Sequence, residues 1–157
     1  MLAINKSETK MKKLLFQKLS SHGGILPPKK KGDCAFDLVC AEDRFISAPS
    51  VGEKPKDIPI GVAVKIPHGY FGLIINRSSA SRTVGVHVIP GIIDEGYVGP
   101  LYACVYPMGE YSVYIKKGDR VAQLILLPSF TPEMEEVESL PITERGSSGF
   151  GSTGINT

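Results

Sequence analysis

Short apolar runs, separated by glycine, proline and charged residues, cover most of the chain. The clearest run spans residues 58–66, where every second position is apolar: Ile58, Ile60, Val62, Val64 and Ile66. A period of two is typical of a β-strand with one buried face. Similar runs predict further strands at residues 14–19, 35–40, 69–75, 84–89, 101–106, 111–115 and 121–127. The pattern therefore predicts an all-β sandwich or barrel.

Length and composition agree with a single domain of this kind. A chain of 157 residues with 42% hydrophobic residues can bury about two thirds of its unfolded surface. The 17 Gly and 12 Pro are spread along the sequence, which favours many short strands over long helices. The net charge of +2 gives no electrostatic reason to expect a nucleic-acid partner.

Cysteine usage and hydropathy bear on the environment of the protein. The three cysteines are an odd number without Cys-x-x-Cys spacing, so neither a disulfide framework nor a zinc site is indicated. No apolar run approaches the roughly 20 residues of a membrane span, and the N-terminus lacks the features of a secretory signal. We therefore expect an intracellular protein, cytoplasmic or nuclear, without a membrane partner, and an organellar or virus-encoded origin remains open.

The two ends of the chain differ from its middle. Residues 1–13 are polar without a clear pattern and are expected to form a loose N-terminal extension before a β domain at 14–142. Residues 143–157 are rich in glycine and hydroxyl side chains. Such a composition cannot build its own core. We expect a mobile C-terminal arm that something outside the arm must order.

The strongest candidate for chemistry is Asp94. An apolar approach over residues 91–93 leads to this acid in a glycine-flanked bend, and Tyr97 follows three positions later. Burying an unpaired carboxylate costs far more than one side chain's apolar contacts return. Asp94 is therefore predicted to be a site residue rather than a core residue.

Other polar side chains interrupt or end apolar strands. Arg77, Ser78 and Ser79 directly follow one strand, where a guanidinium fork and backbone N–H groups suit a phosphate. Asp37 and Gln123 each lie within an apolar run. Taken singly, Arg77 also fits a surface ion-pair donor, Asp37 fits a turn acid and Gln123 fits a satisfied core amide. Five such segments in one short chain favour a shared site.

Those five segments, in this order, resemble the five motifs of the homotrimeric dUTPases. The matching stretches are residues 35–38, 77–79, 91–99, 118–124 and 145–154. The resemblance implies a jelly-roll-like β barrel that forms a homotrimer, with each active site assembled from three subunits. It also implies hydrolysis of dUTP to dUMP and pyrophosphate with Mg²⁺ as cofactor, which lowers dUTP and supplies dUMP for thymidylate synthesis.

The resemblance assigns a role to each residue of the third motif. Asp94 would be the general base that deprotonates the attacking water, and Tyr97 would pack against the deoxyribose and exclude a ribose. The backbone of Gly91, Ile92 and Ile93 would bind the uracil edge.

The remaining motifs would hold the phosphates and the metal. Arg77, Ser78, Ser79 and Gln123 would bind the phosphate chain, and Asp37 would contact Mg²⁺ through water, with the triphosphate as the main ligand. In the arm, the expected substrate-binding residues are Arg145, Phe150, Gly151, Ser152 and Thr153. Phe150 would lie over the uracil, whereas Arg145, Ser152 and Thr153 would bind the far phosphate.

Three other functions remain open at this point. A dCTP deaminase shares the fold but needs an additional acid–base Glu, for which Glu95 is the best local candidate. A non-catalytic nucleotide-sensing or regulatory module would keep the pocket without turnover, and a structural barrel subunit would need no pocket. The chain also departs from the family pattern, with Ala35 and Ser79 where Gly is usual and Asn76 where Pro is usual.

Overall fold

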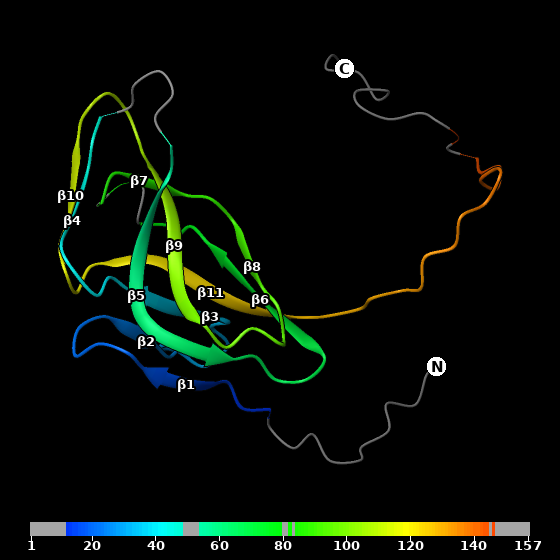
Figure 1. The fold of residues 1–157 in the computed structure, drawn as a ribbon, viewed down its shortest axis with the longest axis horizontal. Coiled ribbons are helices and arrows are strands. Elements are labelled where there is room, and N and C mark those ends of the chain that lie inside the picture. Colours follow the sequence, from blue (N-terminus) through cyan, green and yellow to red (C-terminus); the bar gives the residue numbers. More distant parts are fainter. Residues whose placement is uncertain (1–11, 49–53, 80–81, 83, 145, 147–157) are drawn as a thin grey trace.

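The computed structural model describes residues 12–48, 54–79, 82, 84–144 and 146. In this part of the chain the regular elements are eleven β-strands (Figure 1). They are β1 (Leu15–Lys18), β2 (Gly24–Leu26), β3 (Ala35–Val39), β4 (Arg44–Ile46), β5 (Lys56–Lys65), β6 (Tyr70–Ile75), β7 (Val86–Val88), β8 (Gly91–Ile93), β9 (Pro100–Pro107), β10 (Val113–Ile115) and β11 (Arg120–Pro128). The prediction of an all-β fold is confirmed.

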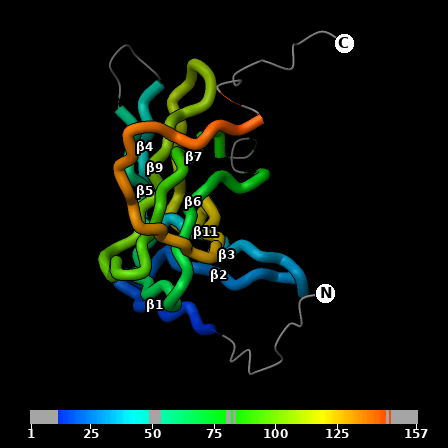
Figure 2. Tube along the Cα trace, turned by 90° about the vertical axis from the view of Figure 1, so that its right-hand side faces the viewer, coloured from blue at the N-terminus to red at the C-terminus, as the bar shows by residue number. Residues whose placement is uncertain are grey.

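The strands form two antiparallel sheets and one short ribbon. One sheet has the order β1-β5-β9-β7, the other has the order β2-β3-β11-β6-β8, and β4 pairs with β10. Figures 1 and 2 show β1 at one edge of the body and the β4–β10 ribbon at the opposite end. The two sheets share a single core, because one cluster of buried side chains draws residues from both.

The core follows from the alternation in β5. The side chains predicted to share a face are all buried: Ile58, Ile60, Val62, Val64 and, just after the strand, Ile66. From the opposite sheet, Leu38, Ile74 and Leu124 complete the cluster. Each fully buried aliphatic side chain of this size contributes about 1.5–3 kcal/mol. Among the described residues no polar or charged residue is buried, so the functional groups lie on the outer surfaces of the sheets.

Eight of the eleven strands lie where the apolar pattern predicts them, with bounds that differ by a few residues. The pattern misses β2, β4 and β8, each of which has three residues. Three residues are too few to display a period. Residues 91–93 in particular are expected only as an approach to a bend, whereas they pair with β6 as strand β8.

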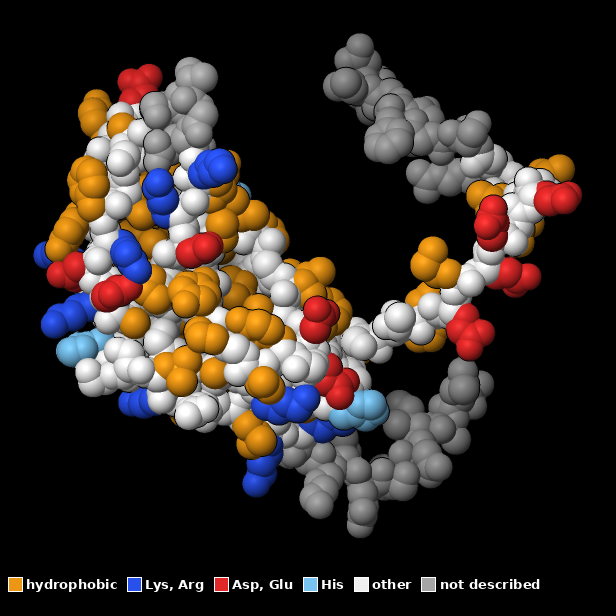
Figure 3. Space-filling view, in the orientation of Figure 1, with side chains coloured by type: hydrophobic (Ala, Val, Ile, Leu, Met, Phe, Trp, Pro, Cys, Tyr) orange, Lys and Arg blue, Asp and Glu red, His pale blue; other side chains and the backbone are white. Residues whose placement is uncertain are grey.

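Beyond β11 the chain leaves the sheets. Figure 3 shows this stretch extending away from the body with acidic and hydrophobic side chains exposed along it, and Phe130 is 88% exposed. Residues 1–11, position 145 and residues 147–157 lie outside the described residues, so the extension and arm boundaries remain predictions. The structure contains no described helix that is long and apolar enough to span a membrane.

Candidate active site

A cleft of about 720 Å³ lies on the outer surface of the five-stranded sheet, over β3, β11 and β6. Strand register determines which side chains form its floor. Gln123 on β11 is opposite Asp37 on β3 and also opposite Ile75 on β6. Residues directly opposite one another in antiparallel strands point to the same face of the sheet. The register therefore brings Asp37 and Gln123, which are far apart in sequence, into one cleft.

A β-bulge adds Arg120 to this cleft. Arg120 and Gln123 are three positions apart, so a regular strand would point them to opposite faces. The register shifts between Arg120 and Ala122, which pair with Val39 and Leu38 respectively. The extra residue on β11 turns Arg120 to the face that carries Asp37. Sequence reasoning missed Arg120, and its only signal is its place within the fourth motif.

Asp37 is held between two arginines in a partly buried cluster. Arg77 Nε donates to Asp37 Oδ1 at 2.6 Å, and Arg120 Nη1 donates to Asp37 Oδ2 at 3.0 Å. Arg77 Nη1 also donates to the Arg120 carbonyl at 3.2 Å. The side chains of Arg77 and Asp37 are only 21% and 22% exposed. Charge-assisted hydrogen bonds of this kind set the direction of the Arg77 guanidinium before any ligand binds.

Asn76 lies between the last residue of β6 and Arg77, and its hydrogen bonds hold the end of that strand in place. The Gln123 side-chain amide donates to the Asn76 carbonyl at 2.9 Å, so the amide that the sequence predicts to need a partner has one. The Asn76 side chain accepts from the Val88 backbone N–H at 2.7 Å and contacts His87 Nδ1 at 2.7 Å. These contacts tie the end of β6 to β7.

The cleft is suited to an anion. Its lining carries three cationic side chains (Lys29, Arg77 and Arg120) against two carboxylates (Asp33 and Asp37). Ser78 also lines it. Ser79 is half-buried and is not among the lining residues, so the structure brings together only part of the predicted phosphate-binding group.

Asp94 lines a different cavity, of about 480 Å³, together with Phe71 and Ile92. Phe71 lies on β6 four positions before Ile75, which lines the first cleft. At about 3.3 Å per residue the Cα atoms of Phe71 and Ile75 are about 13 Å apart along the strand. One copy of the chain therefore does not place Asp94 in the cleft of Asp37 and Arg77.

Strand β8, which leads to Asp94, presents an open edge. It is the last strand of its sheet in the described part of the chain, and it pairs only with β6. An edge strand offers unpaired backbone N–H and C=O groups to another partner. Ile92 is 66% exposed, and a Cβ added at Gly91 would meet nothing within 4 Å. Space is thus available beside this backbone.

Tyr97 closes the turn that carries Asp94. Its backbone N–H donates to the Asp94 carbonyl at 3.1 Å, and its hydroxyl donates to the Pro100 carbonyl at 2.8 Å. The ring lies so close to Gly99 that a Cβ there would be 2.6 Å from the hydroxyl oxygen. Glycine at 99 is therefore required by the ring, which remains 41% exposed and accessible to a ligand.

The carboxylate of Glu95 points to the turn between β5 and β6. One oxygen accepts from the Gly69 backbone N–H at 2.9 Å, and the other contacts His68 Nδ1 at 3.0 Å. The Gly69 hydrogen bond and, to a smaller extent, His68 lower the pKa of Glu95. An ionised carboxylate with its acceptors engaged is poorly suited to act as a general acid.

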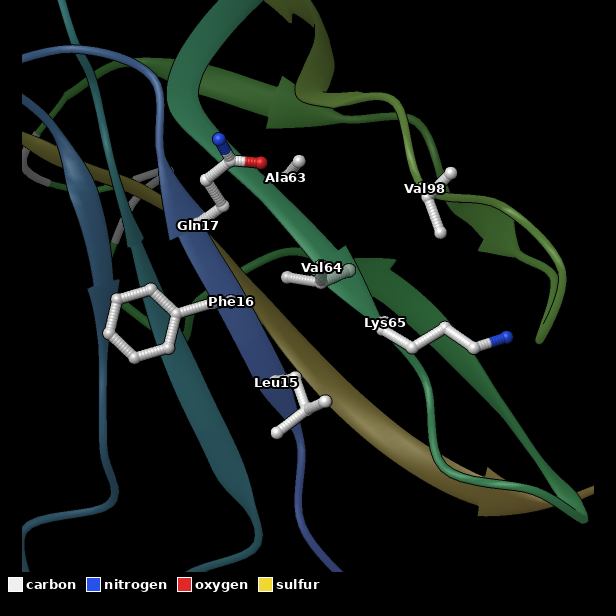
Figure 4. Close-up of a pocket in the computed structure, with 7 residues that line it drawn as sticks. All are labelled: Leu15, Phe16, Gln17, Ala63, Val64, Lys65 and Val98. Atoms are coloured by element: carbon white, nitrogen blue, oxygen red, sulfur yellow. The ribbon is translucent and has the colours of Figure 1, made fainter.

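A third hollow, of about 230 Å³, lies between β1, β5 and the loop that carries Val98 (Figure 4). Its described lining is aliphatic and aromatic apart from Gln17 and Lys65. Lys65 donates to the Glu95 carbonyl at 2.7 Å. With no acid or nucleophile in its lining, this hollow is assigned no chemistry.

Comparison with known proteins decides the family. The family model described as dUTPase matches residues 21–154, which is most of the chain. The chain belongs to the dUTPase family. This dUTPase is 37% identical over 145 residues to the deoxyuridine 5'-triphosphate nucleotidohydrolase of Paramecium bursaria Chlorella virus 1, covering 92% of the chain and 100% of the relative. It is 38% identical over 143 residues to the Mus musculus enzyme of that name, covering 91% and 86%.

Solved structures agree. This dUTPase matches a mutant dUTPase of Staphylococcus bacteriophage 80alpha in complex with dUpNHpp, with a TM-score of 0.79 at 30% identity, covering 91% of the chain and 99% of that protein. It also matches a mutant dUTPase of phage phi11 whose structure describes a structural Mg(II) ion, with a TM-score of 0.71 at 27% identity, covering 81% and 97%. The expectation of a dUTPase-like jelly-roll barrel is confirmed.

Part of the predicted site falls outside the described residues. Five arm positions of this dUTPase are affected: Arg145, Phe150, Gly151, Ser152 and Thr153. The described site therefore consists of two half-sites on one chain. The cleft of Asp37, Arg77, Ser78 and Gln123 is one half, and the β8 edge with Asp94 and Tyr97 is the other.

Proposed function

We propose that this chain hydrolyses dUTP to dUMP and pyrophosphate by attack of water on the α-phosphorus. The observation that carries the proposal is the pairing of an anion-binding cleft with a free carboxylate at an open strand edge, in a fold that matches a phage dUTPase in complex with dUpNHpp. The reaction lowers dUTP and supplies dUMP for thymidylate synthesis.

Asp94 is the general base in this proposal. Its carboxylate is exposed and makes no hydrogen bond to any described residue, so both oxygens are available to a water molecule. The water forms a bond to the α-phosphorus and passes a proton to Asp94, while the bond from the α-phosphorus to the bridging oxygen breaks. Pyrophosphate leaves with that electron pair. Proton transfer to a positioned carboxylate contributes about 10²–10⁴-fold.

The β8 edge and Tyr97 are proposed to select the nucleoside. Backbone groups of Gly91, Ile92 and Ile93 would bind the uracil edge closely enough to exclude a thymine methyl group. The Tyr97 ring, held by the Pro100 carbonyl, would occupy the space that a ribose 2′-hydroxyl needs. A fixed ring would exclude a ribonucleotide sterically, and it would leave the ribose 2′-hydroxyl without a hydrogen-bond partner.

Gly91→Ala is expected to weaken dUTP binding without destabilising the fold. A Cβ at position 91 meets no described atom of this chain within 4 Å, so a change in KM at unchanged stability would come from the ligand that approaches the backbone. We expect a KM raised about tenfold, equivalent to about 1.4 kcal/mol, and an unchanged thermal midpoint. Steady-state kinetics measures KM, and thermal denaturation measures the midpoint.

Gly72→Ala is the contrasting variant. A Cβ there would lie 2.9 Å from Leu124 Cδ1 and 3.2 Å from Ile66 Cδ1, and overpacking of this kind costs about 1–3 kcal/mol. Gly72→Ala should lower the thermal midpoint. A Gly91→Ala enzyme with wild-type KM would remove the β8 edge from the binding site.

The phosphate chain is proposed to bind in the cleft of Arg77, Ser78 and Gln123, with Ser79 close by. The described residues include no cluster of three or more His, Cys, Asp or Glu that could hold a metal, so the triphosphate would provide the main ligands of Mg²⁺. Asp37 fits contact through a water ligand, because its Oδ1 accepts one hydrogen bond, from Arg77 Nε, and retains a lone pair, whereas Oδ2 accepts from both arginines. When bound, Mg²⁺ neutralises phosphate charge and orients the chain for attack.

The separation of the two half-sites supports a proposal that neighbouring copies share each site in a homotrimer. One copy would provide the cleft, another would provide Asp94 and Tyr97, and a third would provide the arm. In the arm, Phe150 would cover the uracil, and Arg145, Gly151, Ser152 and Thr153 would close over the phosphates. Closure excludes water and aligns the reacting groups.

The dCTP deaminase alternative is not favoured. It requires a protonatable Glu directed at the base, whereas Glu95 is directed to Gly69 and His68 and has a lowered pKa. A non-catalytic sensor is not favoured either, because a protein that only binds nucleotide would have no role for the exposed Asp94 carboxylate.

Incubation with Mg²⁺ and one nucleotide at a time tests the proposal. Purified protein should release pyrophosphate from dUTP and not from dCTP or dTTP, and chromatography should show dUMP as the nucleotide product. Deamination of dCTP would establish the deaminase instead. Binding of dUTP without pyrophosphate release would establish the sensor and overturn the hydrolase.

A further inference from the structure

Among the described residues, no side chain contacts the Asp94 carboxylate in a way that could orient it. No described residue bonds to its carboxylate, and its carbonyl accepts from the Tyr97 backbone N–H at 3.1 Å. A general base must nevertheless be held within a few tenths of an ångström of its productive geometry. Something other than a side-chain contact must therefore hold the turn in place.

The neighbouring residue, Glu95, makes three contacts to another element. Its carboxylate accepts from the Gly69 N–H at 2.9 Å and contacts His68 Nδ1 at 3.0 Å. Its carbonyl accepts from Lys65 Nζ at 2.7 Å. Figure 4 shows the Lys65 side chain reaching from β5 toward the loop that carries Val98. Glu95 is thus fastened from two sides to the end of β5 and the turn before β6.

We propose that Glu95 is a positioning residue that clamps the turn of Asp94 to the turn between β5 and β6. This inference rests on the proposed role of Asp94 as general base. Glu95 takes no part in proton transfer. It fixes the backbone from which the base projects, so that the carboxylate meets the water at a constant position.

The surrounding charges support a clamp rather than a chemical role. Lys65 and His68 face Glu95, and Lys12 donates to the His68 carbonyl at 2.8 Å, which braces the turn from the segment before β1. The lowered pKa keeps the Glu95 carboxylate ionised at and above the ordinary Glu pKa. The clamp would be lost only as pH falls through the lower folded value.

Two substitutions separate positioning from chemistry. Glu95→Ala removes both carboxylate contacts and is expected to lower kcat about 10- to 100-fold, because a shift of about 1 Å in a catalytic group has an effect of this size. Affinity for dUpNHpp should fall much less than kcat, since the phosphate chain and the uracil edge are proposed to bind at residues that Glu95 does not contact. Glu95→Gln keeps an acceptor for Gly69 and a polar group for His68, and is expected to restore kcat to within about threefold of wild type.

The Tyr97 amide provides a readout that does not depend on turnover. Because this N–H bonds to the Asp94 carbonyl, its hydrogen exchange should accelerate in Glu95→Ala and return to the wild-type rate in Glu95→Gln. Glu42→Ala, which removes a surface carboxylate paired with Arg44, is the matched control and should change neither kcat nor exchange.

The outcomes are distinct. Equal loss of kcat in both Glu95 variants would show that the charge itself is needed and would overturn the positioning role. Unchanged Tyr97 exchange in Glu95→Ala would refute the clamp whether or not the wild-type protein hydrolyses dUTP. Absence of wild-type hydrolysis, with faster exchange in Glu95→Ala, would leave the clamp standing and remove the proposed function.

Discussion

Asp94→Asn is expected to lower kcat by about 10²–10⁴-fold, the range for loss of a positioned general base. The amide has the size of the carboxylate but cannot accept the proton of the attacking water. Because the wild-type carboxylate makes no hydrogen bond to a described residue, the substitution breaks none within the described part of the chain. Affinity for dUpNHpp and the thermal midpoint should therefore stay at wild-type values. Pyrophosphate release and calorimetric binding measure these quantities.

Asp57→Asn is the matched control for this change. Asp57 lies on β5 opposite Cys104 and lines neither half-site, so its amide variant should turn over at the wild-type rate. Wild-type turnover by Asp94→Asn would exclude Asp94 as the base. Loss of both dUpNHpp binding and turnover would instead assign Asp94 to substrate binding.

Arg77→Gln is expected to lower kcat/KM by about 10²–10³-fold, as for loss of one preorganised donor to developing charge. The guanidinium is oriented by Asp37 at 2.6 Å, and Gln cannot reproduce its bidentate fork. The effect should appear in both KM and kcat, because the phosphate chain is charged before and during the reaction. Asp37 retains Arg120 at 3.0 Å, so the fold should persist.

Arg44→Gln controls for the loss of a positive charge. Arg44 lies on β4 in a pair with Glu42 and is 44% exposed, so its removal tests net charge without touching the cleft. We expect unchanged kcat/KM. If Arg77→Gln and Arg44→Gln were equally active, the cleft would not be the phosphate site.

The two inactive variants together test whether copies share a site. Subunits with Asp94→Asn and subunits with Arg77→Gln, co-expressed with different tags and purified as mixed oligomers, should regain activity. If copies share sites in the proposed homotrimer, some sites of a mixed oligomer would receive Asp94 from one copy and Arg77 from another, both unaltered. If a single chain supplied both residues, no mixed site would hold the intact pair, and activity would not return.

The strands with a long alternating pattern were predictable because their cause is local. In β5 every second side chain must be apolar to reach the core, and Ile58, Ile60, Val62 and Val64 are all buried. The three-residue strands were not predictable. Strand β8 exists because Gly91–Ile93 pairs with β6, and such a pairing leaves no period in so short a segment.

The cleft shows how far the site residues could be predicted from the sequence. Its Arg77–Asp37 and Arg120–Asp37 contacts join residues that are 40 and 83 positions apart. Arg120 faces Asp37 only because β11 carries a bulge between Arg120 and Ala122. The residue types in this segment do not predict that bulge. The segments that contribute to the cleft were visible in the sequence, but the ion cluster was not.

The amino-acid sequence by itself determined the all-β fold, the identity of the chemical groups and their family, because strand periodicity and motif spacing are properties of neighbouring residues. The tertiary structure alone decided where those groups lie. Strand register gathers Asp37, Arg77 and Gln123 in one cleft and keeps Asp94 in another, and hydrogen bonds across elements direct Glu95 to Gly69 and His68. These outcomes depend on pairings between distant segments, which no local pattern records.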